Sequence, residues 1–227
     1  MQKSEDNIQS LTIHRETLVA KIVDIIENQI LTGKLKPGTK LSEAKVAKEF
    51  NVSRAPAREA LLRLEDTNLL RKNHLGREVT EFSIEEFREI YEVKNVIEAF
   101  AAMQAAHHAT ERDFRRLKSI LDEMHANLSP PKHAKLIKLN SQFHDYIVYC
   151  SQNSKAIELY NLRVKQVRWT TVNYKVRPHL SVKEHQEIYE AFIQKDGSEV
   201  RSRMENHTMG SMERIIAEMK SNYRKKN

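Results

Sequence analysis

The sequence predicts a mainly α protein, with an N-terminal winged helix-turn-helix and a C-terminal all-α antiparallel helical bundle. Apolar residues recur at three- and four-residue intervals along most of the chain, which is typical of amphipathic helices. One short stretch after Leu70 alternates apolar and polar residues instead, as an antiparallel hairpin does. The breaks between helical segments are short, which favours antiparallel neighbours. We expect two domains, 1–82 and 83–227.

The first domain is predicted to hold three helices before the hairpin. The first spans 15–31 and stops at Gly33, and its inward residues are Leu18, Ile22, Ile25, Ile26 and Ile30. Pro37 and Gly38 form a turn, and Ser42 caps a short second helix. Ser53 caps the third helix, 54–66, which tolerates Pro56 in its first turn. A two-stranded wing over 71–82 completes the order of a winged helix.

Everything beyond residue 82 is predicted to be helical. Ser83 and Glu86 have the spacing of a capped helix start. The expected helices span 84–107, 110–127, 132–151, 154–177, 182–195 and 198–221. Prolines at 130, 131 and 178 and the turn at 196–198 separate them, so this domain is expected to be an antiparallel bundle.

Basic residues are concentrated in one part of the chain. Residues 34–77 hold eleven Lys/Arg against five Asp/Glu, which accounts for most of the formal net charge of +7. A polyanion such as DNA attracts such a surplus, and a merely solvated basic surface is the alternative. No apolar run approaches the roughly 20 residues of a membrane-spanning helix, and the first ten residues lack a signal-peptide core. We therefore expect a cytoplasmic protein without membrane contact, in which Cys150 is a small buried hydrophobe.

A detailed motif begins at Gly33. Pro37-Gly38, Leu41 with Glu43, and the run VSRAPAREAL from Val52 to Leu61 follow it. This pattern resembles the DNA-binding domain of the GntR family of bacterial transcriptional regulators, with Ala57 where the family usually has valine. The resemblance implies a winged helix that binds double-stranded operator DNA.

The N-terminal side chains of a helix in the major groove read the bases. Arg54 and Arg58 lie at that position, and arginine can form two hydrogen bonds with guanine, so we expect them to contact bases. Ser53 is expected to cap the helix or to contact a phosphate. Four more residues are predicted to contact the DNA: Gly76 and Arg77 at the wing tip, together with Lys40 and Lys45. The alternative is that the arginines form surface ion pairs with Glu59 or Glu65.

Three of the ten histidines are predicted to converge inside the second domain. Asn140 and His144 are four residues apart and so share the apolar face of one helix. His185 and His207 each lie eleven residues from Asp196, so a helical hairpin brings them level about 16 Å from its turn. Three converging imidazoles repel one another when protonated, whereas a divalent cation satisfies all three. The alternative is structural histidines that are hydrogen-bonded to neighbouring helices.

The same residues resemble the signature of the FCD ligand-binding domain, which occurs in the FadR-type branch of GntR regulators. The matching segments are Asn140 to His144 (NSQFH), Glu184-His185 and His207, with Asn140 where the family normally has aspartate. The resemblance implies a metal held by Asn140, His144, His185 and His207. Zinc is the first expectation, with nickel or manganese as alternatives, and the lost carboxylate is expected to weaken the site.

Lys94 and Glu98 stand where the FCD domain often has Arg-x-x-x-Glu. The lysine keeps the positive charge, but it cannot donate the two parallel hydrogen bonds that an arginine guanidinium gives to a carboxylate. Lys94 is therefore a candidate for binding a small organic-acid effector, and a solvated or ion-paired lysine is the alternative.

These features together imply a transcriptional regulator, expected to be a repressor that binds a palindromic operator as a homodimer and responds to a small carboxylate beside a divalent metal. Activation instead of repression, and a metal-free regulator that senses an acyl thioester, are open alternatives. A metal-dependent hydrolase is a third, but the HExxH motif is absent and no inward carboxylate is evident as a general base. We therefore expect no enzymatic activity.

Overall fold

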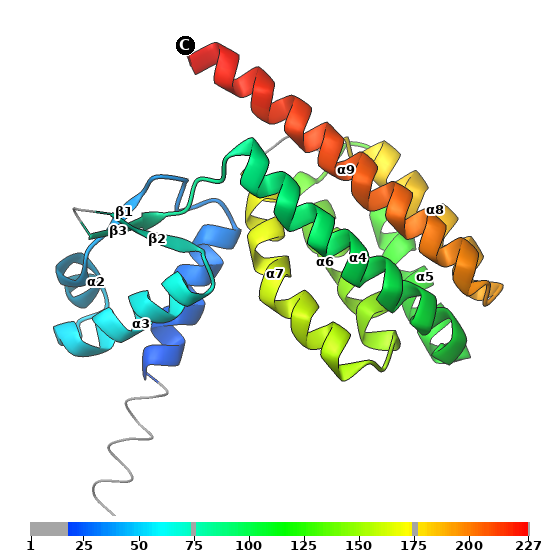
Figure 1. Cartoon of the computed structure of the whole chain (residues 1–227), viewed down its shortest axis with the longest axis horizontal. Helices are drawn as coiled ribbons and strands as arrows, with labels where there is room; N and C mark the ends of the chain where they lie inside the picture. Colours follow the sequence, from blue (N-terminus) through cyan, green and yellow to red (C-terminus); the bar gives the residue numbers. More distant parts are fainter. Residues whose placement is uncertain (1–17, 74–75, 174–176, 227) are drawn as a thin grey trace, which may run out of the picture. The chain divides into compact units, whose positions relative to one another are not determined.

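The structure, a computed structural model, describes residues 18–73, 76–173 and 177–226 (Figure 1). It divides after Glu81 into two compact units, called unit 1 and unit 2 below. The first ten residues, and the start of the helix expected to begin at Arg15, lie outside the described residues. The mainly α fold predicted from the sequence is confirmed.

The first described helix of unit 1 spans residues 18–31. It buries one face, formed by Val19, Ile22, Ile26 and Ile30. The expectation that Leu18 and Ile25 share this face is wrong, because they lie about a quarter of a turn from its centre and are exposed. Gly33 ends the helix with a φ of 73°, a conformation that favours glycine.

Two helices, α2 (Glu43–Glu49) and α3 (Arg54–Asp66), form the helix-turn-helix. Ser42 caps α2 by accepting a 3.2 Å hydrogen bond from the backbone N–H of Lys45. Asn51 makes the tight turn between the helices, with a φ of 51°. The buried face of α3 consists of Pro56, Ala57, Ala60, Leu61 and Leu64. The opposite face of α3 is therefore left at the surface.

A three-stranded sheet forms the wing, in the order β1-β3-β2. Its strands are β1 (Lys40–Leu41), β2 (Leu70–Asn73) and β3 (Gly76–Val79). The β2–β3 hairpin is antiparallel, with Leu70 opposite Val79 and Asn73 opposite Gly76. The prediction of a two-stranded wing missed β1, because a strand of two residues has no alternation to detect. The wing tip, residues 74–75, lies outside the described residues.

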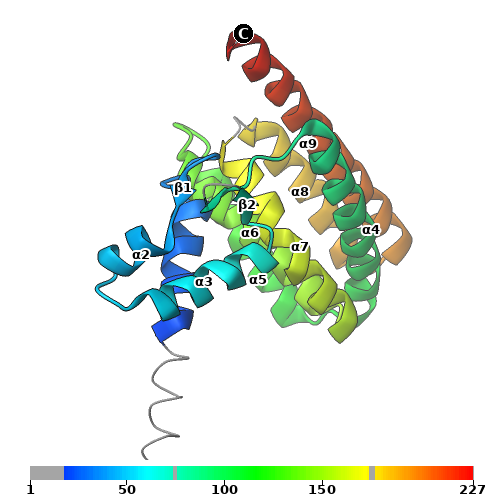
Figure 2. The same cartoon turned by 60° about the vertical axis from the view of Figure 1, so that its left-hand side comes forward.

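Unit 2 is an all-α bundle. Its helices are α4 (Ile84–His108), α5 (Glu111–Ala126), α6 (His133–Cys150), α7 (Ser154–Asn173), α8 (Pro178–Ile193) and α9 (Gly197–Lys226). α4 lies alongside α9 in both Figure 1 and Figure 2, and it also packs against α6 and α7. None of the described helices is long and apolar enough to cross a membrane.

The ends of these helices follow local capping rules. Ser83 and Glu86 form the expected capping box at the start of α4. Asp196 caps α9, since its Oδ1 accepts a 3.0 Å hydrogen bond from the backbone N–H of Glu199. Pro178, expected to break the chain, instead lies in the first turn of α8, where its missing N–H costs nothing. α8 therefore begins four residues before the predicted 182.

The main core of unit 2 is an apolar cluster shared by α4, α5, α6, α8 and α9. Phe143 of α6 is fully buried in it, and its ring centroid lies 4.5 Å from that of His185. The phenyl ring of α6 thus contacts an imidazole of α8 inside the core. The core thus positions the histidines described next.

Candidate nucleic-acid interface and histidine centre

The N-terminal turns of α3 present two exposed arginines, Arg54 and Arg58. The side chain of Arg58 is 68% exposed, and an oxygen of the Glu43 carboxylate lies 3.9 Å from its Nε. Ser53 is the N-cap residue but makes no side-chain capping hydrogen bond. All three side chains thus lie at the end of the helix that enters the major groove in helix-turn-helix proteins.

Glu59 and Glu65, the alternative ion-pair partners of these arginines, bind other arginines in the described part of the chain. Glu59 binds Arg63 at 2.9 Å, and Glu65 binds Arg77 at 2.7 Å. The side chain of Arg77 is largely buried, and it also lies 3.7 Å from Glu43. Arg77 therefore ties the wing to the helix-turn-helix, and its guanidinium is not free for a phosphate in this conformation.

The other predicted DNA contacts lie at the surface of unit 1. Lys40 on β1 and Lys45 on α2 are exposed, and Gly76 begins β3 with a φ of 132°. Lys72 on β2 is also exposed. The sequence analysis did not single out Lys72, because one lysine among many basic residues has no distinguishing spacing.

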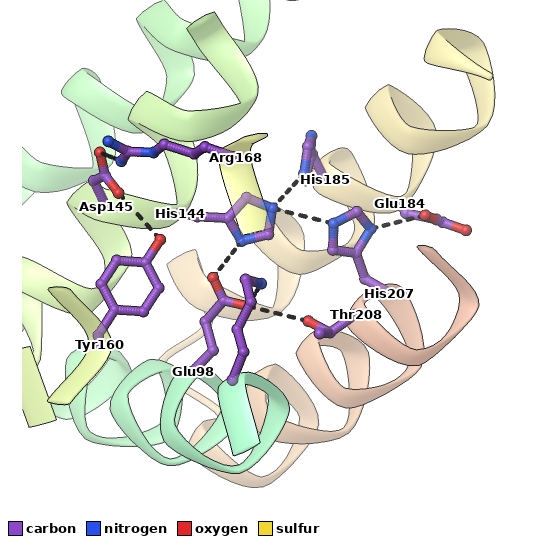
Figure 3. Close-up of polar contacts among 10 residues, drawn as sticks. Glu98, His144, Asp145, Tyr160, Arg168, Glu184, His185, His207 and Thr208 are labelled. Carbon is purple, nitrogen blue, oxygen red and sulfur yellow. Dashed lines mark hydrogen bonds and ion pairs between the residues drawn. The ribbon is translucent and has the colours of Figure 1, made fainter. Parts of the chain in front are cut away.

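The structure brings together the three histidines that the sequence predicted to converge, from α6, α8 and α9 (Figure 3). Nε2 of His144 lies 3.1 Å from Nε2 of His185 and 3.2 Å from Nε2 of His207. All three side chains are buried, and one nitrogen from each lies within 4.8 Å of the other two. We call this cluster the histidine centre.

Two carboxylates hold the outer nitrogens of the histidine centre (Figure 3). Nδ1 of His207 lies 2.7 Å from Oε2 of Glu184. Nδ1 of His144 lies 2.8 Å from Oε1 of Glu98, at ion-pair distance but without the alignment of a full hydrogen bond. In the tautomers that carry the ring proton on Nδ1, facing these carboxylates, both histidines have lone pairs on Nε2.

This proton arrangement fits a cation. The Nε2 atoms of His144 and His207 face each other across 3.2 Å, and with both protons on Nδ1 two lone pairs oppose each other. A divalent ion turns this repulsion into two ligand bonds, and histidine ligands of metals usually have such an outer carboxylate. His185 adds a third nitrogen, while its buried Nδ1 has no partner among the described residues. The residues present therefore fit a divalent metal.

The electrostatics of the histidine centre favour neutral imidazoles. Burial, together with the charges of His207 and His144, lowers the pKa of His185 well below its usual value. Burial also lowers the pKa of His207 to about 4, although Glu184 opposes the shift. Both rings are therefore unprotonated near neutral pH, which is the state that binds metal.

Glu98 is a buried anion at the centre of this network. Burial by itself would raise the pKa of Glu98, but the charges of His144 and Lys94 hold it well below its usual value. Oε2 of Glu98 is bound by the Lys94 ammonium and accepts a 3.2 Å hydrogen bond from Thr208. Glu98 is thus an inward carboxylate that the sequence analysis did not single out. Glu98 is nevertheless a poor general base, because a carboxylate with so low a pKa does not readily take up a proton.

A cavity of about 40 Å³, enough for a few water molecules, opens beside His144 and His207. Asn140, one helical turn before His144, lines this cavity. Lys94 lines it too, but it is buried and ion-paired with Glu98 and is not solvated. α4, α6, α7, α8 and α9 each contribute at least one hydroxyl side chain to the wall. The cavity is therefore small and lined by both polar and apolar side chains.

Sequence analysis missed three groups around the centre. Arg168 of α7 lines the cavity and is bound to Asp145, and Thr208 binds Glu98. Arg214 binds Glu184 through two nitrogens, at 2.9 and 2.8 Å. Arg214 follows His207 by seven residues, so its place on the same face of α9 was a usable signal.

A winged helix with exposed arginines on its recognition helix, followed by an all-α unit with a buried histidine centre, defines a two-domain DNA-binding regulator. The family model "Bacterial regulatory proteins, gntR family" matches residues 18–76, and the FCD domain model matches residues 89–209. The chain belongs to the GntR family of bacterial transcriptional regulators and carries an FCD domain.

Known relatives and solved structures agree with this assignment. The chain is 27% identical over 191 residues to the HTH-type transcriptional repressor RspR of Escherichia coli (strain K12), covering 82% of this chain and 84% of RspR. It is 28% identical over 181 residues to the gluconate operon transcriptional repressor of Bacillus licheniformis, covering 80% and 73%. The solved structure of E. coli McbR/YncC matches with a TM-score of 0.75 and 21% identity, over 92% of this chain and 99% of McbR/YncC. At that identity the structural match shows the fold alone.

Proposed function

We propose that this GntR-family regulator is a repressor that binds a palindromic operator as a homodimer and responds to a small carboxylate bound beside a divalent metal. Residues 1–82 would bind the DNA, and residues 83–227 would sense the effector. Relatives named as repressors support repression over activation. The observation that carries the sensing part is the convergence of three buried imidazole nitrogens, two of them on rings oriented by carboxylates.

The proposed DNA contacts of unit 1 are assigned from the exposure of each side chain and from its position on the winged helix. Arg54 and Arg58 would read bases from the first turns of α3, since both are exposed there. Ser53, Lys40, Lys45 and Gly76 would contact the phosphate backbone. Arg77 would act through Glu65, by holding the wing against α3.

The metal would be held by His144, His185 and His207, with Asn140 as a neutral fourth neighbour. Zinc is the first choice, because it readily accepts a set of imidazole ligands, and nickel or manganese are alternatives. When bound, the ion would supply a positive centre that a carboxylate oxygen can approach. The polar wall of the cavity would then orient the rest of the effector.

The charge of Lys94 is already balanced by Glu98, so Lys94 would contribute less to effector binding than the resemblance implies. Arg168 is a second cation at the cavity wall, although Asp145 partners it. A small hydroxylated carboxylate suits the hydroxyl groups around it. An acyl thioester is a worse fit, because its long acyl chain needs a larger cavity than this one.

The experiment combines metal analysis with operator selection. Purified protein is analysed for metals, and its operator is selected from a random DNA library. We expect close to one divalent ion per chain and a selected sequence with two inverted half-sites. Small hydroxy acids are then tested for their effect on operator affinity. Metal-free protein whose operator affinity responds to acyl thioesters instead would contradict the proposal.

A further inference from the structure

The carboxylates around the histidine centre are balanced by cations of the same chain. Glu98 and Glu184 each contact a histidine of the centre (Figure 3). Each carboxylate is also bound by a basic side chain, and the pairs are Glu98 with Lys94, Glu184 with Arg214, and Asp145 with Arg168. Lys94 and Arg168 are the charged residues among those described in the cavity wall, and both belong to these pairs. The three pairs therefore add no net charge to the surroundings of the centre.

The side chains that would hold the metal are neutral as well. His144, His185 and His207 bind a metal only as unprotonated imidazoles, and Asn140 carries an uncharged amide. A divalent ion held by these groups would keep its whole double positive charge. An unbalanced charge in a buried site is costly, because neither solvent nor a counter-ion offsets it. The centre therefore lacks the negative charge that a divalent ion requires.

The cavity beside His144 and His207 has room for a small counter-ion. Three imidazoles leave one position of a tetrahedral zinc site open, as in catalytic zinc sites. Asn140 lines the same cavity, so a carboxylate bound there would lie next to both the amide and the histidines. Ser181 and Ser211 also line it, and their hydroxyl groups can donate hydrogen bonds to a carboxylate oxygen. An anion in the cavity would therefore supply the missing charge.

We propose that the histidine centre binds its metal and a small carboxylate cooperatively, because the neutral Asn140 leaves the negative charge to be supplied by the carboxylate. Each of the two would raise the affinity for the other by the same factor, as thermodynamic linkage requires. Zinc alone would still bind through the three imidazoles, but more weakly. The inference rests on the metal and the effector of the proposed function and states how their binding is coupled.

The same charge balance defines the class of effector. A neutral ligand of similar shape, such as an amide, would fill the open position but leave the charge of the ion unbalanced. A 2-hydroxycarboxylate offers a hydroxyl oxygen next to its negative charge, and both groups can approach one ion. The cavity of about 40 Å³ favours a short acid such as glycolate. Small 2-hydroxy monocarboxylates are therefore expected to bind in preference to their amides.

The test measures the zinc affinity of the full chain by competition with a chromophoric chelator. Glycolate is expected to lower the zinc Kd of wild type about 10- to 100-fold, the usual range for coupled sites. Glycolamide has nearly the same shape without the charge, and it is expected to change the zinc Kd little. The chelator is calibrated in each solution, so that zinc binding by free glycolate does not distort the comparison.

Two variants of α6 test the part assigned to Asn140. Asn140→Asp is expected to bind zinc more tightly than wild type without glycolate, and glycolate is expected to add little, because the negative charge is already present. Gln142→Glu is the matched control, since it makes the same change from amide to carboxylate about 200° away around the same helix. Gln142 is not among the described residues that line the cavity, so this variant is expected to behave as wild type does. Circular dichroism verifies that both variants fold.

Calorimetry tests the reciprocal effect. Glycolate is expected to bind zinc-loaded wild type more tightly than zinc-free wild type, by the factor found for zinc. A zinc Kd that glycolate leaves unchanged, or that glycolate lowers as much in Asn140→Asp as in wild type, would overturn the inference. An equal response to glycolamide and glycolate would overturn it too, because the coupling would then not depend on charge.

Operator binding separates this inference from the proposed function. A chain whose zinc and glycolate binding are coupled, but whose operator affinity no small carboxylate changes, would contradict the proposed function and leave the inference standing. A chain whose operator affinity responds to glycolate, but whose zinc Kd does not depend on glycolate, would do the reverse. A chain that binds no zinc with or without glycolate would contradict both.

Discussion

Glu184 and His207 bridge the hairpin of α8 and α9 through a 2.7 Å contact between Oε2 and Nδ1. The same carboxylate accepts two hydrogen bonds from the guanidinium of Arg214. Burial would raise the pKa of Glu184, but the hydrogen bonds from His207 and Arg214 lower it below its usual value. Glu184 is therefore a fixed anion that sets which nitrogen of His207 faces the histidine centre.

Replacing Glu184 by glutamine should weaken metal binding without removing a ligand. We expect Glu184→Gln to lower the affinity for zinc roughly 10- to 100-fold, because the charge that orients and polarises His207 is lost. Competition with a chromophoric chelator measures this. Glu187→Gln is the matched control, since Glu187 lies on the same helix and binds Arg203 near the surface. Equal losses in both variants would contradict the role of Glu184.

Each histidine of the centre should be required for metal retention. We expect His144→Ala, His185→Ala and His207→Ala to be purified with much less metal than wild type, because two imidazoles hold a divalent ion far less tightly than three. Elemental analysis after dialysis measures the content. His179→Ala, at an exposed position on α8, should keep the wild-type content. Full metal content in all three variants would disprove the site.

Loss of the buried charge on Glu98 should destabilise unit 2. Glu98→Gln leaves the Lys94 ammonium buried without its anion, and breaking a buried pair in this way costs about 3–5 kcal/mol. Urea unfolding monitored by circular dichroism measures the change. Adding Lys94→Met to the same chain should recover part of the loss, because it removes the unpaired cation. A loss well below 1 kcal/mol for Glu98→Gln would show that the pair is not important for stability.

The recognition-helix arginines should govern sequence-specific DNA binding. A bidentate arginine–guanine contact contributes about 1–3 kcal/mol, so Arg54→Ala or Arg58→Ala should weaken operator binding by roughly 10- to 100-fold. Fluorescence anisotropy with the selected operator measures the affinity. Arg63→Ala removes an arginine of the same helix that is engaged with Glu59, and it should have little effect. If Arg63→Ala weakened binding as much as Arg58→Ala, general charge and not base contact would explain the loss.

Local sequence patterns were sufficient to predict most of the helices and strands and to identify the family. The spacing of Val52 to Leu61 identified the recognition helix, and the limits of α3 agree with the prediction. The equal distances of His185 and His207 from Asp196 predicted their meeting, because helix geometry is regular enough to extrapolate over eleven residues. Caps at Ser42 and Ser83 were found for the same reason, since capping is decided within a few residues.

Contacts between distant segments needed the folded chain. β1 exists only because Lys40 and Leu41 pair with β3, far along the sequence. The roles of Glu98 and Glu184 as partners of His144 and His207, and the engagement of Arg77 by Glu65, depend on which helices lie side by side. The periodicity of one helix predicts which of its faces is buried. It does not predict which polar group of a neighbouring helix pairs with a given side chain, because that pairing depends on how the helices pack.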